Sequence, residues 1–112
     1  MVRIRPGEPE LPGNEILKQY LGSLGLGVKY LSDEVPPNVG PLDPRNRLIF
    51  MTGPLTGTPV PCSTSCGVIT VNADTGYTVG AAFTHGLFGS YLKFAGYDGI
   101  IVQGASDRPV FL

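Results

Sequence analysis

Short apolar runs that end at glycine or proline most strongly limit how this chain can fold. The clearest runs are RLIFMT (47–52), GVITVN (67–72) and the segment 100–103, and turn-forming stretches such as GPLTGTPVP separate them. With 16 Gly and 11 Pro among 112 residues, no regular element in this part of the chain can be long. Runs of this length that are rich in Val and Ile are typical of strands. We expect a small, turn-rich sheet, with YTVGAAF (77–83) as a weaker strand or a strand that runs into a helix.

The segment before these runs has the spacing of an amphipathic helix. Asn14 suits the N-cap position, where its side-chain oxygen can accept a hydrogen bond from a free backbone amide. Apolar side chains then recur along one face, at Ile16, Leu17, Tyr20, Leu21 and Leu24. The three glycines within 22–27 each cost a helix about 0.8–1.0 kcal/mol relative to Ala. The helix should therefore break near 22–27 and resume through 28–31, or continue there because another backbone packs close.

A second helical segment is expected over residues 85–95. Thr84 can act as its N-cap, and Gly96 lies where a left-handed C-terminal cap is usual. Asp98 should close a turn that leads into the last strand. The order of helix, strands, helix and strands predicts an α+β fold, a small β-rich domain with two helical segments. We assign residues 1–13 to an extended, proline-rich lead-in and residues 14–112 to this domain.

The overall composition argues against two classes of partner. The net charge is −1 and the eight Lys and Arg are scattered, so no basic stripe is present to neutralise nucleic-acid phosphates. No apolar run approaches the roughly 18 residues of a membrane-spanning helix, and no apolar targeting segment is present. We therefore expect a soluble, cytoplasmic chain. Only 15% of residues are charged and 42% are apolar, which favours a surface covered by another domain or subunit, including a second copy.

The only two cysteines lie four positions apart in PCSTSC (61–66). A tetrahedral zinc site or an iron–sulfur cluster needs about four ligands, and His85, the only histidine, could add a third at best. A metal site within this chain is therefore not expected. A disulfide between Cys62 and Cys66 is possible in a bent loop, but free thiols are the preferred interpretation in a reducing compartment.

Other candidate motifs are weak when each is taken alone. The segment TGPLTGT (52–58) matches neither a dinucleotide fingerprint nor a P-loop, although its glycines would allow amides to converge on an anion. A tight turn between strands explains it equally well. His85 could be an acid–base group or a ligand contact, or it could be structural. No Ser-His-Asp arrangement is recognisable, so we assign no catalytic residue.

Four motifs in sequence are together specific, namely LGSLGLG (21–27), DEVPP (33–37), NRLIFMTGPLTGT (46–58) and FGSYLKFAGYDGIIVQG (88–104). Residues 20–112 resemble the N-terminal domain of tungsten-dependent aldehyde:ferredoxin oxidoreductases. The resemblance implies a β-rich α+β domain built as two similar halves around a bis-pterin cofactor of tungsten or molybdenum, of which this chain is about the first half. It also implies oxidation of aldehydes to carboxylic acids, with electrons passing through a [4Fe–4S] cluster, held by later domains, to ferredoxin.

The resemblance places candidate cofactor contacts at Ser65, Cys66, Thr84, His85 and Gly86. Only Gly86 carries over by identity, because the family usually has Asn-Ser-Gly-Gly before the Phe-Gly pair. The family also tends to have an arginine after TGPLTGT that reaches the pterin or its phosphate, whereas this chain has no charge in 63–66. Two hypotheses follow. The chain is the cofactor-binding part of such an enzyme, completed by missing C-terminal domains or a larger partner chain, or it is a non-catalytic remnant or self-associating module.

Overall fold

The chain folds into one antiparallel sheet with helices on its two faces. The computed structural model describes residues 2–3 and 14–109. Along the chain the elements are β1 (Val2–Arg3), α1 (Asn14–Tyr20), α2 (Ser23–Glu34), β2 (Arg47–Thr52), β3 (Cys66–Val71), β4 (Val79–Thr84), α3 (Phe88–Phe94) and β5 (Gly99–Gln103). The strands pair in the order β1-β5-β2-β3-β4, and every pairing is antiparallel. The predicted small, β-rich α+β fold is confirmed.

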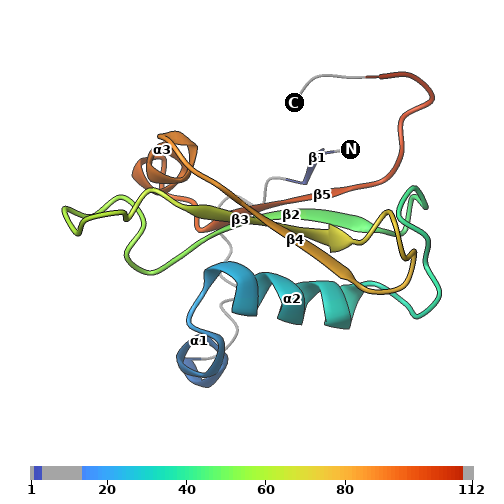
Figure 1. The fold of residues 1–112 in the computed structure, drawn as a ribbon, viewed down its shortest axis with the longest axis horizontal. Coiled ribbons are helices and arrows are strands. Elements are labelled where there is room, and N and C mark those ends of the chain that lie inside the picture. Colours follow the sequence, from blue (N-terminus) through green and yellow to red (C-terminus); the bar gives the residue numbers. More distant parts are fainter. Residues whose placement is uncertain (1, 4–13, 110–112) are drawn as a thin grey trace.

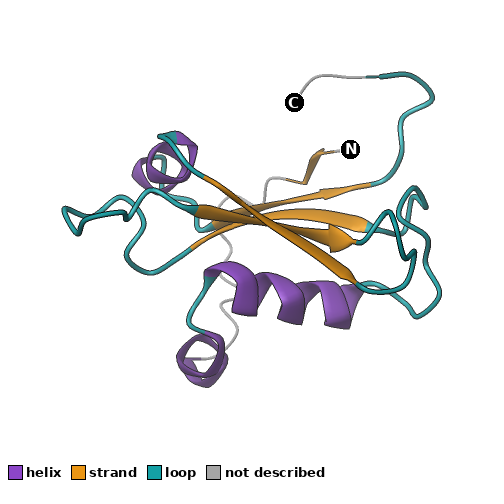
Figure 2. Ribbon diagram, in the orientation of Figure 1, coloured by secondary structure: helices purple, strands orange, loops and turns teal. Residues whose placement is uncertain are grey.

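The two faces of the sheet are covered unequally. Helix α2 lies along one face and packs on β2 and β3, whereas α3 sits over one end of the other face (Figure 1). Figure 2 shows the same arrangement, with the strands between the two groups of helices. The core lies between α2 and the sheet and is formed by Leu26, Leu31, Ile49, Met51 and Ile69.

The first helical segment breaks earlier than its glycines suggested. The interruption falls at Leu21 and Gly22, which both have a positive φ, and α2 then runs without a break through Gly25 and Gly27. A Cβ atom on Gly27 would lie 2.5 Å from Cδ1 of Ile69. The predicted break over 22–27 is therefore wrong beyond position 22. The alternative, in which the helix continues because another group packs close to it, is correct. The group that packs against Gly27 is the Ile69 side chain and not another backbone.

The predicted strands are found within one or two residues of their expected ends. The run 47–52 forms β2, and the expected strands at 67–72, 77–83 and 100–103 correspond to β3, β4 and β5. Helix α3 is shorter than predicted, because it begins at Phe88 and not at residue 85. Thr84 is the last residue of β4 and does not cap α3, whose N-cap is Leu87 without a side-chain hydrogen bond. The predicted cap is therefore wrong.

The C-terminal end of α3 is as predicted. Gly96 has φ +88°, and its N–H donates to the carbonyl of Lys93 at 2.9 Å. The N–H of Tyr97 donates to the carbonyl of Leu92 at 3.1 Å, which completes a Schellman motif. Asp98 was expected to close the turn that leads into the last strand, and β5 begins at the next residue, Gly99. Its carboxylate pairs with Lys93, and its carbonyl oxygen accepts hydrogen bonds from the main chain and side chain of Thr52.

Part of the expected lead-in lies outside the described residues. Of segment 1–13, the structure describes only Val2–Arg3, which pair with β5. Within the described part of the chain, no helix is both long and apolar enough to cross a membrane.

Candidate functional site

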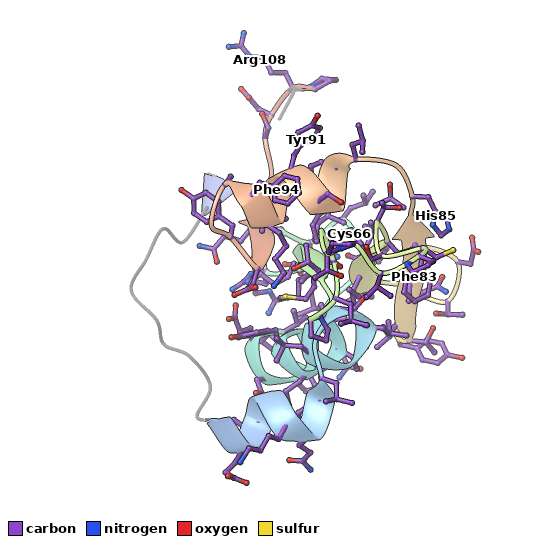
Figure 3. All side chains as sticks on the ribbon, turned by 90° about the vertical axis from the view of Figure 1, so that its left-hand side faces the viewer. Cys66, Phe83, His85, Tyr91, Phe94 and Arg108 are labelled. Atoms are coloured by element: carbon purple, nitrogen blue, oxygen red, sulfur yellow. The ribbon has the colours of Figure 1, made fainter. Side chains whose placement is uncertain are left out.

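The two segments that carry the predicted cofactor contacts meet at one end of the sheet. Cys66 and Thr84 lie opposite each other as the first residue of β3 and the last residue of β4. Ser65 precedes this pair and His85 follows it, and the Ser65 Oγ atom lies 3.0 Å from the His85 Nδ1 atom. Figure 3 shows His85 at the outer flank of the molecule, close to the end of β4. The antiparallel register therefore brings together side chains from two loops.

Four of the five predicted residues lie at this end of the sheet, and we term them the strand-end site: Ser65, Thr84, His85 and Gly86. His85 and Gly86 are exposed, and Ser65 and Thr84 are half-buried. Gly86 has φ +95°, and no atom would lie within 4 Å of a Cβ built on it. A positive φ favours glycine at this position, and the open space lets a ligand approach the main chain closely. The site thus offers a hydroxyl pair, an imidazole and an accessible backbone.

The fifth predicted residue, Cys66, takes a different position. Its side chain is fully buried, and its Sγ atom donates a weak hydrogen bond to the carbonyl of Gly67 at 3.6 Å. Burial raises the pKa of the Cys66 thiol, so the protonated form is favoured. Cys62 is exposed, and both cysteines are free. Among the described residues, no three His, Cys, Asp or Glu side chains gather closely enough to share a metal ion.

The glycine-rich segment 52–58 forms a tight turn that uses most of its own amides. The buried hydroxyl of Thr56 accepts a hydrogen bond from the N–H of Gly53 and donates one to the carbonyl of Ser65. The amides of Thr56, Gly57 and Thr58 also donate to carbonyls within residues 53–63. These amides are therefore not directed at a shared anion, and the turn interpretation of this segment is the correct one. Its hydroxyl contact anchors the main chain next to the strand-end site.

The strand-end site has no neighbouring cation in the described part of the chain that could replace the family's arginine. Segment 53–66 contains no Lys or Arg. Lys93 is paired with the carboxylate of Asp98. Arg108 lies in the loop after β5, apart from His85 (Figure 3). The described part of this surface thus offers no Lys or Arg that could pair with a phosphate.

Helix α3 buries one large apolar side chain and leaves its aromatic side chains exposed. Gly89, Ser90 and Leu92 are buried, and a Cβ atom on Gly89 would lie 3.2 Å from the Cβ atom of Cys66. Tyr91 is 62% exposed and Phe94 is 68% exposed, although their rings make an edge-to-face contact. We term the exposed set Leu87, Tyr91 and Phe94 the apolar α3 face. The apolar spacing of this segment predicted a helix but did not reveal which side faces the solvent.

The sequence of this chain matches one family of known proteins. A family model described as "Aldehyde ferredoxin oxidoreductase, N-terminal domain" matches residues 8–112. The chain belongs to this family. It is 48% identical over 98 residues to the tungsten-containing aldehyde ferredoxin oxidoreductase of Pyrococcus abyssi, a match that covers 88% of this chain and 16% of the relative.

Proteins with other names are also similar to this chain. The WOR-like subunit of an aliphatic sulfonate oxidoreductase from Pyrococcus furiosus is 36% identical over 115 residues, which cover 100% of this chain and 18% of that subunit. A chain of the BamBC active-site complex of benzoyl coenzyme A reductase, solved with 1,5-dienoyl-CoA, has a TM-score of 0.80 and 40% identity. That match covers 85% of this chain and 14% of the solved chain. The chain therefore spans less than a fifth of the length of these relatives.

Proposed function

We propose that this chain is the cofactor-binding portion of a tungsten or molybdenum pterin oxidoreductase. The whole enzyme would oxidise aldehydes to carboxylic acids and pass the electrons through a [4Fe–4S] cluster to ferredoxin, in the cytoplasm. The cluster and most of the substrate pocket would belong to a larger partner chain or to further domains. The observation that carries this proposal is the 3.0 Å contact between Ser65 and His85, which joins the two segments where the family resemblance places candidate cofactor contacts.

The chemistry of the strand-end site suits a pterin. A pterin ring has N–H donors and nitrogen and oxygen acceptors along its edge, and hydroxyl and imidazole groups can pair with either kind. The exposed main chain at Gly86 would let a flat ring approach without a side-chain clash. Cys66 would contribute by holding the main chain in place through its pairing with Thr84, because its thiol is buried. The bound cofactor would supply the redox chemistry, and these residues would hold and orient it.

The range of related proteins supports a cofactor-holding role for this domain. The relatives are named for aldehyde, aliphatic sulfonate and benzoyl coenzyme A chemistry, yet each contains a segment similar to this chain. A segment that occurs in enzymes with such different substrates is better explained by binding of a common cofactor than by selection of the substrate. We assign the choice of substrate to the rest of the protein.

The apolar α3 face supports the presence of a larger partner or further domains. Large apolar side chains that project into water are typical of surfaces that another protein covers. Burial of such side chains contributes about 1.5–3 kcal/mol each, so three of them can anchor an interface. Leu87, the first residue of this face, directly follows Gly86 in the chain, so an occupant that contacts Leu87 would lie near the strand-end site.

A second candidate function is a non-catalytic remnant that keeps the fold but has lost the cofactor. Two observations favour it. Segment 53–66 has no cation to pair with a pterin phosphate, and most amides of the 52–58 turn are already bonded. A charge-assisted bidentate contact is among the strongest available to a phosphate, so its loss would weaken cofactor binding.

Metal and pterin analysis of protein purified anaerobically from its native host separates the two candidates. Tungsten and molybdenum would be measured by elemental mass spectrometry, pterin by the fluorescence of its oxidation products, and co-purifying chains by peptide mass spectrometry. Cofactor together with a larger, cluster-bearing chain is the expected result. Protein that is free of both metal and pterin in every fraction would contradict the proposed function and favour the remnant.

A further inference from the structure

The outer side of β4 is an unprotected edge of the sheet. β4 is the last strand in the order, and no described strand pairs with its outer side. Native proteins usually protect such an edge with charged residues, proline, a bulge or a covering element. The sequence of β4, VGAAFT, has no charge and no proline, and its register with β3 is regular along its whole length. The edge is therefore open to pairing with another strand.

The hydrogen-bond pattern between β3 and β4 shows which β4 residues direct their main-chain N–H and C=O groups away from β3. The N–H of Asn72 donates to the carbonyl of Thr78 at 2.8 Å, and these residues continue the β3–β4 register as an opposed pair. Because hydrogen-bonded pairs alternate along an antiparallel ladder, every second residue after Thr78 turns its main chain towards β3. The remaining residues direct their N–H and C=O groups away from the sheet. These are Val79, Ala81 and Phe83.

The side chains of the same residues form an exposed apolar row. Tyr77 is 81% exposed, Val79 is 44% exposed and Phe83 is 55% exposed. Side chains alternate between the two faces of a strand, so Val79, Ala81 and Phe83 share the face on which α2 lies, and Tyr77 precedes this row in the turn before β4. Helix α2 packs on β2 and β3 and leaves this row uncovered. Figure 3 shows Phe83 at the same outer flank as His85.

We propose that β4 pairs antiparallel with β4 of a second copy of this chain, centred on Ala81, to give one continuous sheet. This interface goes beyond the proposed function and does not depend on it. In this register Ala81 lies opposite Ala81 of the second copy, and Val79 lies opposite Phe83. The row of side chains is thus complementary to itself, and pairs of aromatic and β-branched residues across a ladder are favourable.

The main chain of an identical edge supplies the matching donors and acceptors. The three outward-facing residues of each copy would form about six interchain hydrogen bonds, two for each opposed pair. Burial of an aromatic side chain removes about 150–250 Å² from water, and the Phe83 ring of each copy lies along this ladder. The interface is therefore smaller than the roughly 1,200 Å² of stable complexes, which predicts a weak dimer that forms only as the concentration rises. β4 has no charged residue, so no like charges oppose each other along the ladder.

Sedimentation velocity on the full 112-residue chain over a wide concentration range tests this interface. We expect the wild-type chain to pass from monomer to dimer as its concentration rises. Ala81→Lys would place two like charges directly opposite each other at the two-fold axis and should weaken dimerisation at least tenfold. Ala82→Lys is the matched control, because it adds the same charge on the opposite face, where Gly80 of the second copy would lie opposite. It should dimerise like the wild type, and circular dichroism would check that both variants fold.

Amide exchange gives a second readout with a residue-level signature. The amides of Val79, Ala81 and Phe83 should become protected as the concentration rises, whereas those of Gly80 and Ala82 should be protected by β3 at every concentration. A chain that stays monomeric throughout, or a dimer that Ala81→Lys leaves intact, would overturn the proposal. Loss of the dimer on substitution of Tyr91, without any effect at Ala81, would also overturn it in favour of the apolar α3 face. None of these outcomes depends on cofactor content.

Discussion

The hydroxyl of Ser65 and the imidazole of His85 lie 3.0 Å apart, although twenty positions separate them in the chain. The contact exists because each residue adjoins one end of an opposed strand pair, Cys66 and Thr84. Neither side chain needs a long loop to reach the other. The strand-end site is therefore built by the sheet itself.

Removal of either partner of this contact should reduce cofactor retention more than stability. In the protein purified from its native host, Ser65→Ala and His85→Ala should each lower the pterin content per chain about two- to tenfold, the effect of one lost hydrogen bond of about 0.5–1.5 kcal/mol. Urea unfolding should show little change, because surface substitutions usually stay within about 0.5 kcal/mol. Thr75→Ala is the control, since it removes a comparable hydroxyl pair with Thr78 in the hairpin. Equal pterin losses in all three variants would rule out a specific role for the site.

The close approach of α2 to the sheet predicts a strong effect at Gly27. Gly27→Ala should destabilise the fold by about 1–3 kcal/mol, because its Cβ would overlap Cδ1 of the fully buried Ile69. Ile69→Val removes that methyl group, so the double variant should be less destabilised than the sum of the single variants. Gly40→Ala, where a Cβ would meet no atom within 4 Å, should be nearly neutral. Urea unfolding of the four proteins measures these differences, and strictly additive effects would contradict the contact.

The two cysteines should react very differently. A thiol reagent should modify exposed Cys62 in the native protein and reach buried Cys66 only after denaturation. Peptide mass spectrometry before and after denaturation would distinguish the two sites. Comparable native labelling at both positions would show that the start of β3 opens readily.

The same buried thiol makes a predictable contribution to the pH dependence of stability. Burial raises the pKa of Cys66, so above the usual thiol value of about 8.5 the unfolded chain loses a proton that the folded chain keeps. Its contribution to stability is complete below the unfolded pKa and is lost as the pH rises through the folded pKa. The alkaline decline in the free energy of unfolding should therefore be shallower in Cys66→Ala, whatever its stability at neutral pH. An unchanged pH slope would show that this thiol does not contribute.

The apolar α3 face should matter for the partner and not for the fold. Tyr91→Ser and Phe94→Ser should reduce the amount of larger chain that co-purifies from the native host, because both rings project into solvent. Tyr77→Ser removes an even more exposed aromatic ring from the hairpin and is the control. Quantitative mass spectrometry of the purified complex gives the ratio of the two chains. Loss of the partner in Tyr77→Ser alone would place the contact on the hairpin side of the molecule.

Much of the fold could be predicted from the sequence because local signals agree with the tertiary structure. The run at 47–52 is apolar on both faces and became β2 with its predicted bounds, and Gly96 has the positive φ of a C-terminal cap. Gly27 was expected to interrupt the helix, but it lies inside the continuous helix α2. Its cost in helix propensity is outweighed by the close contact with Ile69, and no local pattern reveals which core side chain will lie there.

The candidate site was harder to predict from the sequence. Ser65 and His85 were selected by their positions in a family pattern, since no spacing rule connects residues on neighbouring strands. Thr84 was misplaced because its hydroxyl suits an N-cap, yet pairing with Cys66 keeps it in β4. The orientation of α3 could not be predicted either. Its buried side includes Gly89, which fits against Cys66, and Leu92, whereas the equally apolar Tyr91 and Phe94 face the solvent.

The hairpin between β3 and β4 has a consequence for how this protein can change over evolutionary time. Asn72 holds the turn by accepting the N–H of Asp74 on its side chain and the N–H of Gly76 on its carbonyl. The turn fixes the alignment of β3 and β4, and a slip of one residue would move every β4 side chain to the opposite face. Ser65 and His85 would then no longer meet at the other end of the strands. The length of this turn therefore determines whether the strand-end site forms, although the turn lies at the opposite end of the strands. A single-residue deletion in the turn would disrupt the site as much as a substitution within it.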